Sequence, residues 1–166
     1  MGNENLDATI DVLYRIKRGL AAYVSYLAAC EMNAAFSEYV LYEPALRILT
    51  ARGFATQSEV ECPGYARKGR GDVRRLDFVA QGHGSHFALE VKWARNSRPR
   101  VNGDLEKLRK YREAHGQALG FLCVFGRKSD LAALVLPEGL RERGSALYAE
   151  FGKTRFGCRI YQVADG

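Results

Sequence analysis

Two acidic residues and a lysine, Asp77, Glu90 and Lys92, stand in two short apolar runs of the sequence and have types and spacing suited to chemistry. The runs read RLDFVA and ALEVKW, and the segment 82–85 between them (GHGS) is typical of a four-residue hairpin loop. We therefore expect the runs to pair as antiparallel strands, with Asp77 opposite Glu90. Carboxylates that lie close together repel each other unless positive charge lies between them. A divalent cation such as Mg²⁺ supplies that charge, because it prefers oxygen ligands and keeps several waters.

The distribution of apolar residues predicts the register of this hairpin. In the register that places Gln81 opposite His86, the apolar residues share one face: Leu76, Phe78, Ala80, Phe87, Leu89, Val91 and Trp93. Asp77, Glu90 and Lys92 then share the opposite face. A slip of one residue would place Asp77 opposite an apolar residue and mix the two faces. The alternative interpretation of the three charged residues is an ion-pair cluster on a solvent-facing side of the sheet.

The elements that must position these residues follow from hydrophobic periodicity and from breaker residues. In chain order we expect helices over 6–31 and 44–52, strands over 54–62, 73–81 and 86–93, a polar helix over 103–115, a strand over 119–125, and in the tail one helix and a closing strand over 158–163. This order predicts an α/β fold with a mixed sheet. The stretch 20–29 is apolar almost all round, so it is expected to be buried in its own domain or in a homodimer.

Basic residues are concentrated in two parts of a chain of 166 residues with a formal net charge of +6. Segment 64–75 has five basic residues and one acidic residue, and segment 92–112 has eight and two. In the rest of the chain acidic residues outnumber basic ones. A basic focus of this kind is what binding to a nucleic-acid backbone requires. Solvated loops that are basic only for solubility are the alternative.

The composition excludes several classes of protein. With 47% apolar and 27% charged residues the chain is typical of a globular protein. The longest apolar run, 19–30, is too short to span a bilayer. The four cysteines lack zinc-site spacing, and without a signal peptide we expect reduced thiols and a cytoplasmic location. The sequence has no P-loop, dinucleotide fingerprint or Ser/His/Asp order.

A helix with a glutamate, a glycine–aromatic turn, a strand, an aspartate, a hairpin and Glu-x-Lys follow one another over about 38–125. This order resembles the PD-(D/E)xK nuclease superfamily, although Leu76 stands at the proline of the motif's name. The resemblance implies a restriction-endonuclease-like fold, in which a mixed sheet is flanked by helices, here with an extra N-terminal helix. It also implies an enzyme, a Mg²⁺- or Mn²⁺-dependent endonuclease that hydrolyses phosphodiester bonds, with DNA favoured over RNA.

The resemblance assigns roles to the residues of the hairpin. Asp77 matches the first acidic metal ligand of the family, and Glu90 and Lys92 match its Glu-x-Lys pair. The backbone carbonyl of Val91 would be a further metal ligand. Lys92 would activate water or neutralise charge on the phosphate.

Other residues receive roles by the same resemblance. Glu43, ten residues before Gly53, best matches the family's helix glutamate, and Glu38 is the second choice. The run DLEKL (104–108) resembles an Asp-x-x-Lys-Leu helix that follows the catalytic strand in relatives, which would bring Lys107 to a phosphate. A solvated helix is the alternative there. The basic residues expected to bind nucleic acid are Arg67, Lys68, Arg70, Arg95, Arg98, Arg100 and Lys107.

The whole chain, 1–166, is expected to form one nuclease-like domain. Within it 1–33 would be an N-terminal helical extension, 38–125 the catalytic core, and 126–166 a C-terminal helix and strand. Two other functions stay open at this point: a non-catalytic nucleic-acid-binding or assembly module on the same fold, and an interaction protein that dimerises through its first helix. A recruiting protein partner is also compatible with the sequence.

Overall fold

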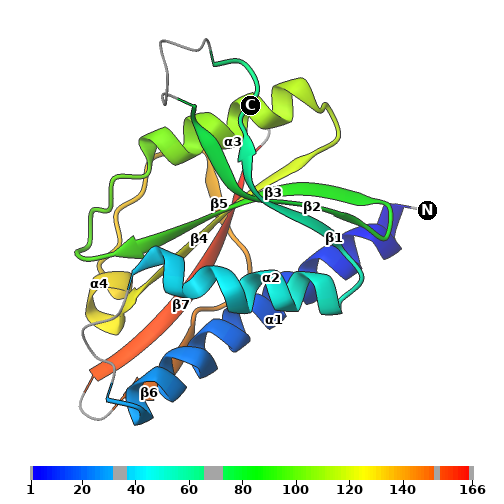
Figure 1. Cartoon of the computed structure of the whole chain (residues 1–166). Coiled ribbons are helices and arrows are strands. Elements are labelled where there is room, and N and C mark those ends of the chain that lie inside the picture. Colours follow the sequence, from blue (N-terminus) through cyan, green and yellow to red (C-terminus); the bar gives the residue numbers. More distant parts are fainter. Residues whose placement is uncertain (1, 32–36, 66–72, 152–153, 165–166) are drawn as a thin grey trace.

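A seven-stranded mixed β-sheet forms the centre of the structure, and helices lie on both of its faces (Figure 1). The computed structural model describes residues 2–31, 37–65, 73–151 and 154–164. The described elements are α1 (Gly2–Ala29), the 3₁₀ helix η1 (Glu38–Leu41), α2 (Tyr42–Ala51), β1 (Ala55–Glu61), β2 (Arg75–Gly82), β3 (Ser85–Ala94), α3 (Asn102–Ala114), β4 (Leu119–Arg127), α4 (Lys128–Ala132), β5 (Leu140–Glu142), β6 (Leu147–Phe151) and β7 (Thr154–Val163).

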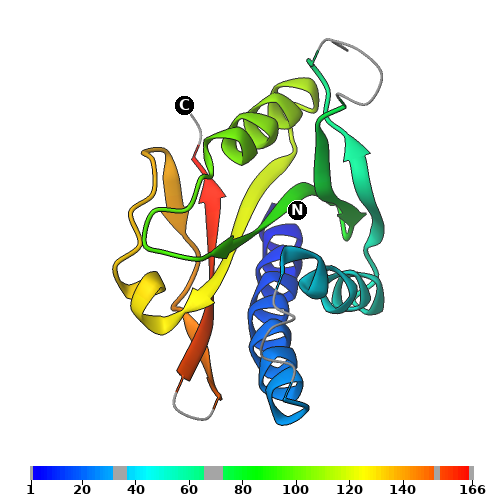
Figure 2. The same cartoon turned by 60° about the vertical axis from the view of Figure 1, so that its left-hand side comes forward.

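The strands are arranged in the order β1-β2-β3-β4-β7-β5, and β6 also pairs with β7. β3 and β4 run parallel, and the other neighbouring pairs run antiparallel. Parallel neighbours need a crossover connection, and α3 supplies it. α3 covers one face of the sheet, whereas α1 and α2 cover the other (Figure 2). The predicted α/β fold with a mixed sheet flanked by helices is confirmed.

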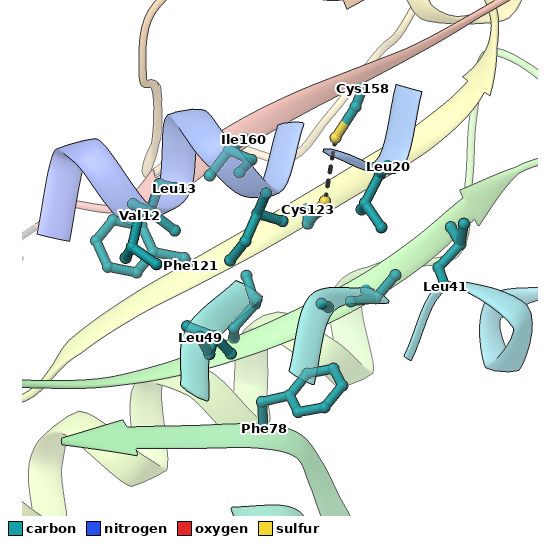
Figure 3. Packing of buried hydrophobic residues seen from close by; sticks show 14 of the residues in the cluster. Val12, Leu13, Leu20, Leu41, Leu49, Phe78, Phe121, Cys123, Cys158 and Ile160 are labelled. Atoms are coloured by element: carbon teal, nitrogen blue, oxygen red, sulfur yellow. Dashed lines mark hydrogen bonds between the residues drawn. The ribbon is translucent and has the colours of Figure 1, made fainter. Parts of the chain in front are cut away.

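Helix α1 belongs to the main hydrophobic core. Val12, Ile16, Leu20 and Val24 recur at helical spacing and are fully buried. Figure 3 shows this side of α1 facing Phe121 and the neighbouring strands. Burial of each such side chain contributes about 1.5–3 kcal/mol. Helix α1 is thus packed into the core of this chain, and the predicted division of the chain into an extension (1–33), a catalytic core (38–125) and a C-terminal part (126–166) stays a prediction. In the apolar stretch that suggested a dimer, Leu20, Val24 and Leu27 are buried in this chain whereas Tyr26 is 61% exposed, and the dimer stays a prediction. No helix in the described ranges is long and apolar enough to cross a membrane.

Helix α2 begins two residues before the predicted start and ends one residue before the predicted end, with Pro44 and Gly53 in the roles that the sequence predicts. Pro44 lies in its first turn, where a missing N–H costs nothing. Gly53 follows the helix with a φ of 80°, a left-handed conformation that glycine adopts without steric cost. The chain turns there, and the Phe54 N–H donates to the Leu49 carbonyl at 3.1 Å. This turn directs the chain into β1.

The hairpin of β2 and β3 has the predicted register, with Gln81 paired with His86. Its loop is shorter than predicted, because Gly82 and Ser85 are themselves paired. Only His83 and Gly84 connect the strands, with φ angles of 52° and 68°. Positive φ at both central residues defines a type I′ turn, whose twist matches that of the flanking strands.

The sequence predicted that Leu76 shares a sheet face with Phe78 and Ala80, and this prediction was wrong. Main-chain pairing of β2 with β3 ends at Phe78↔Leu89, one residue short of Asp77. There the Asp77 carboxylate accepts a hydrogen bond from the Val91 N–H at 2.7 Å. Because a side chain takes the place of a main-chain partner, the alternation of faces breaks, and Leu76 packs in the cluster against α3.

The C-terminal part contains more strands than predicted. The sequence predicts one helix and one closing strand after β4, whereas the structure also has β5 and β6. Both are short, with three and five residues, and both pair with β7. Strands of this length carry little periodicity, and their partner lies elsewhere in the sequence.

Candidate active site

Charged side chains gather where η1, β1, β2, β3 and α3 meet, around a cavity of about 260 Å³. We call them the acid–lysine cluster. Its members are Glu38 on η1, Glu59 on β1, Arg75 and Asp77 on β2, Glu90 and Lys92 on β3, and Asp104 and Lys107 on α3. Five carboxylates and three cationic groups leave the cluster with a formal charge of −2.

Glu90 lies at the bottom of the cluster and is only 2% exposed. Its Oε2 accepts a hydrogen bond from Lys107 Nζ at 2.6 Å. Its Oε1 is buried and has no hydrogen-bond partner among the residues that the structure describes. Burial, and then the charge of Asp77, raise the pKa of Glu90 to about 9. An unpartnered buried carboxylate oxygen is energetically costly, and a bound cation would remove that cost.

Asp77 is held on both of its oxygens. Oδ2 accepts the hydrogen bond from the Val91 N–H, and Oδ1 accepts one from the hydroxyl of Tyr42. Burial raises the pKa of Asp77 although both hydrogen bonds lower it. Burial and the hydrogen bond to Asp77 also raise the pKa of Tyr42, so its hydroxyl remains a donor. Each carboxylate oxygen keeps a second lone pair that can bind a cation.

Lys92 bridges two carboxylates at the mouth of the cluster. Its Nζ lies 3.4 Å from Glu38 Oε1 and 3.2 Å from Asp104 Oδ2. Glu38 Oε1 also accepts a hydrogen bond from the Trp93 N–H at 3.1 Å, which fixes η1 against β3. Burial lowers the pKa of Lys92, but Asp104 and Glu38 outweigh it and raise the pKa above its ordinary value. Lys92 is therefore a fixed positive charge and not a proton acceptor at neutral pH.

Lys107 joins the deeper part of the cluster. Besides Glu90, its Nζ contacts Asp104 Oδ1 at 3.3 Å and the Arg75 carbonyl at 2.9 Å. Asp104 and Lys107 are three residues apart on α3, so they share one helix face and reach β3 together. The sequence predicts that Lys107 binds nucleic acid, and the structure places its ammonium group inside the cluster.

The structure brings most of the predicted catalytic residues together. Asp77, Glu90, Val91 and Lys92 line the same cavity. Glu43 does not, because it lies exposed on the first turn of α2 and pairs with Arg47 four residues later. Glu38, the second choice for the helix glutamate, lies in the cluster. The reason is that η1 precedes α2 and turns this residue towards β3.

The basic residues predicted to bind nucleic acid have different placements. Arg67, Lys68 and Arg70 lie outside the described residues. Three exposed arginines line a second cavity of about 380 Å³, which we call the arginine pocket: Arg95, Arg98 and Arg100. Glu38 and Tyr39 line both this pocket and the cavity of the cluster, so the two are adjacent.

Sequence reasoning assigned no definite role to three residues of the site, Asp104, Tyr42 and Glu59. Asp104 had a signal, since it begins the Asp-x-x-Lys-Leu run, but only its lysine was considered for a role. Tyr42 had no such signal, because the sequence does not distinguish a tyrosine that packs in the core from one that hydrogen-bonds to a carboxylate. For Glu59 and Glu61 the sequence left two roles open, an approach of one of them to the site and solubility of an edge strand. Glu59 lines the cluster with a φ of 54°, a left-handed conformation that costs a non-glycine residue about 1–3 kcal/mol.

The donor set of the cluster limits which metal sites are compatible with it. In the described part of the chain, no group of three or more His, Cys, Asp or Glu side chains could hold a metal ion. A site for Mg²⁺ commonly uses only one or two carboxylates, with waters and substrate phosphates as its other ligands. Asp77 and the unpartnered Oε1 of Glu90 fit this smaller set. The formal charge of −2 equals what one divalent cation neutralises.

Comparison of the chain with known protein families, with curated proteins and with solved structures gives no match. The resemblance carried by Asp77, Glu90 and Lys92 therefore stays a prediction. A functional assignment has to rest on the geometry and charge of the acid–lysine cluster.

Proposed function

We propose that this protein is a metal-dependent nuclease of the PD-(D/E)xK type that hydrolyses phosphodiester bonds in nucleic acid, with DNA favoured over RNA and internal cleavage over exonuclease action. The restriction-endonuclease-like fold is part of this proposal. One observation carries it: the buried Oε1 of Glu90, which has no hydrogen-bond partner among the described residues, lines a cavity together with the half-buried carboxylate of Asp77 in a cluster of formal charge −2. A site made only of structural ion pairs is expected to give its buried oxygens hydrogen-bond partners.

Three groups of the chain would hold the cation, Mg²⁺ or Mn²⁺. They are the carboxylates of Asp77 and Glu90 and, as the family resemblance implies, the backbone carbonyl of Val91. When bound, the cation supplies positive charge that neutralises a phosphodiester and lowers the pKa of water. The raised pKa of Glu90 means that the folded protein has to release a proton to bind it, and Tyr42 keeps Asp77 in position.

The reaction adds the oxygen of water to phosphorus and breaks one ester P–O bond, and the leaving oxygen takes up a proton. Negative charge builds up on the phosphate oxygens as the new bond forms. Lys92 is protonated and held by Glu38 and Asp104, so its charge is already in place when that build-up begins. Lys107 fixes Glu90 through its Oε2. Both lysines therefore act by electrostatics and positioning.

A cleavage assay tests this function. Single-stranded, duplex and branched DNA and RNA would be incubated with the full chain in Mg²⁺ or in EDTA. We expect cleavage in Mg²⁺ alone, and none by Glu90→Gln, which keeps the shape of the side chain but lacks its charge. Binding of nucleic acid without cleavage of any substrate would contradict the proposal and favour the non-catalytic module.

A further inference from the structure

The arginine pocket differs from the acid–lysine cluster in charge and in exposure. Its volume of about 380 Å³ is within the range of small-molecule sites. Arg95, Arg98 and Arg100 are exposed, and none of their guanidinium groups forms an ion pair in the described part of the chain. Arginines that are not engaged with carboxylates are suited to bind a phosphate, often with two parallel hydrogen bonds.

Two aromatic residues give the pocket a second property. Tyr39 on η1 is 75% exposed, more than any other large apolar side chain among those described. Its ring packs against that of Tyr42, with centroids 5.3 Å apart. Trp93 also lines the pocket and packs against Phe125, with centroids 4.9 Å apart. An exposed ring beside free guanidinium groups is the combination that binds a base by stacking and its phosphate by charge.

The position of the pocket determines what can reach it. Glu38 and Tyr39 belong to its wall and to the wall of the cluster, so one strand can occupy both sites. The bases of a duplex are stacked inside the helix and cannot reach an aromatic side chain unless they are unpaired. A ligand that fills the pocket therefore has a free base next to the phosphate at the cluster.

We propose that the arginine pocket binds one unpaired nucleotide, with its base against Tyr39 and Trp93 and its phosphate against the arginines. The inference rests on the proposed function in taking the cluster as the place of cleavage. It assigns the substrate class: strands that are single-stranded beside the cut, such as overhangs, gaps or flaps.

The chain contains its own reporter for this site, because Trp93 is its only tryptophan. Intrinsic fluorescence would be recorded while oligothymidylate, oligouridylate or a duplex of equal length is added in EDTA. We expect saturable quenching of Trp93 by single strands and none by duplex at the same concentrations. The two single-stranded arms distinguish DNA from RNA. No response to either single strand, or an equal response to duplex, would overturn the inference.

A matched pair of variants tests the stacking contact. Tyr39→Ala is expected to weaken single-strand binding about 5- to 150-fold, the usual cost of losing one stacked base. Tyr14→Ala removes another exposed tyrosine, on α1, and is expected to bind like the wild type. Equal affinity of Tyr39→Ala and wild type would overturn the inference.

The two proposals fail in different ways. Mg²⁺-dependent cleavage of duplex with an unresponsive Trp93 would overturn the pocket and leave the nuclease. Quenching by single strands without any cleavage would support the pocket and overturn the nuclease.

Discussion

Lysine side chains are buried in two regions of the molecule, and their partners differ. Lys17 on α1 is 3% exposed, and its Nζ donates to the carbonyls of Arg143 and Ser145 at 2.8 and 2.9 Å. Lys107 in the acid–lysine cluster is 14% exposed and contacts carboxylates. Burial lowers the pKa of Lys17. Burial also acts to lower the pKa of Lys107, but Glu90 and Asp104 outweigh it and raise the pKa.

The difference separates a structural charge from a functional one. The ammonium of Lys17 and its two neutral acceptors tie α1 to the segment before β6, and nothing in that arrangement calls for another ion. With all five carboxylates ionised the cluster has two more negative charges than positive ones, and Oε1 of Glu90 has no hydrogen-bond partner among the described residues. We infer that the first region stabilises the fold and that the second gives up stability for a ligand.

The largest expected effect is on the cleavage rate, which should depend on the acid–lysine cluster and not on Lys17. Lys92→Met removes the charge that faces the developing phosphate charge, so cleavage is expected to fall about 100-fold or more. Folding stability is also expected to fall, since Glu38 and Asp104 lose their shared partner. Lys17→Met serves as the control and is expected to cleave at the wild-type rate. Initial rates in saturating Mg²⁺ decide this, and a fully active Lys92→Met would refute its assigned role.

The next effect is on stability. Lys17→Met removes two part-buried hydrogen bonds to the carbonyls of Arg143 and Ser145, so the free energy of unfolding is expected to fall by about 1 kcal/mol. Chemical denaturation of the variant and the wild type measures this. An unchanged midpoint would mean that water or a local shift replaces the ammonium, and that Lys17 is not the structural charge described above.

A smaller effect on activity distinguishes the two glutamates before β1. Glu38→Gln weakens the hold on Lys92 and is expected to lower the cleavage rate about tenfold, as the loss of one charge-assisted contact does. Glu43→Gln disturbs only an exposed pair with Arg47 and is expected to cleave normally. Slow cleavage by Glu43→Gln and normal cleavage by Glu38→Gln would instead support Glu43 as the helix glutamate, as the sequence predicted.

The pH dependence of stability is expected to have opposite signs in the two regions. The folded pKa of Glu90 is about 9 against a reference of 4.5, so the folded state keeps a proton that the unfolded state loses. The contribution of Glu90 to stability is therefore present at low pH and declines as pH rises between these values. Lys17 has a lowered pKa, so its contribution rises as pH approaches 10.5. Denaturation would be measured at a series of pH values. The loss of stability between pH 4.5 and 9 is expected to disappear in Glu90→Gln, and the gain of stability towards pH 10.5 in Lys17→Met.

The sequence predicted the strands around the site because one face of the hairpin is apolar. That pattern was enough for the register of Gln81 and His86. It was not enough at Leu76. There the Asp77 side chain accepts the hydrogen bond of the Val91 N–H in place of a main-chain partner, and hydrophobic periodicity does not predict a hydrogen bond of this kind.

The surroundings of the site were harder to predict because they depend on contacts between distant segments. Glu38 was ranked below Glu43 because of the spacing of Glu43 to Gly53, and the short helix η1 has too few residues to show a period that would have predicted it. Asp104 meets Lys92 only because α3 crosses over β3. The burial of α1 could not be assigned to this chain, because its apolar stretch alone does not tell packing on the chain's own α2, β4 and β7 from packing on a second copy.

Metal binding to the cluster tests the central claim most directly. Mn²⁺ would be titrated calorimetrically into the full chain in buffers of different ionisation enthalpy, with Glu90→Gln and Glu43→Gln alongside. We expect at least one ion to bind with release of a proton, because Glu90 must ionise to become a ligand. Glu90→Gln is expected to lose that proton release and most of the affinity, and Glu43→Gln neither. Equal binding by all three proteins, or no binding at millimolar Mn²⁺, would contradict the account.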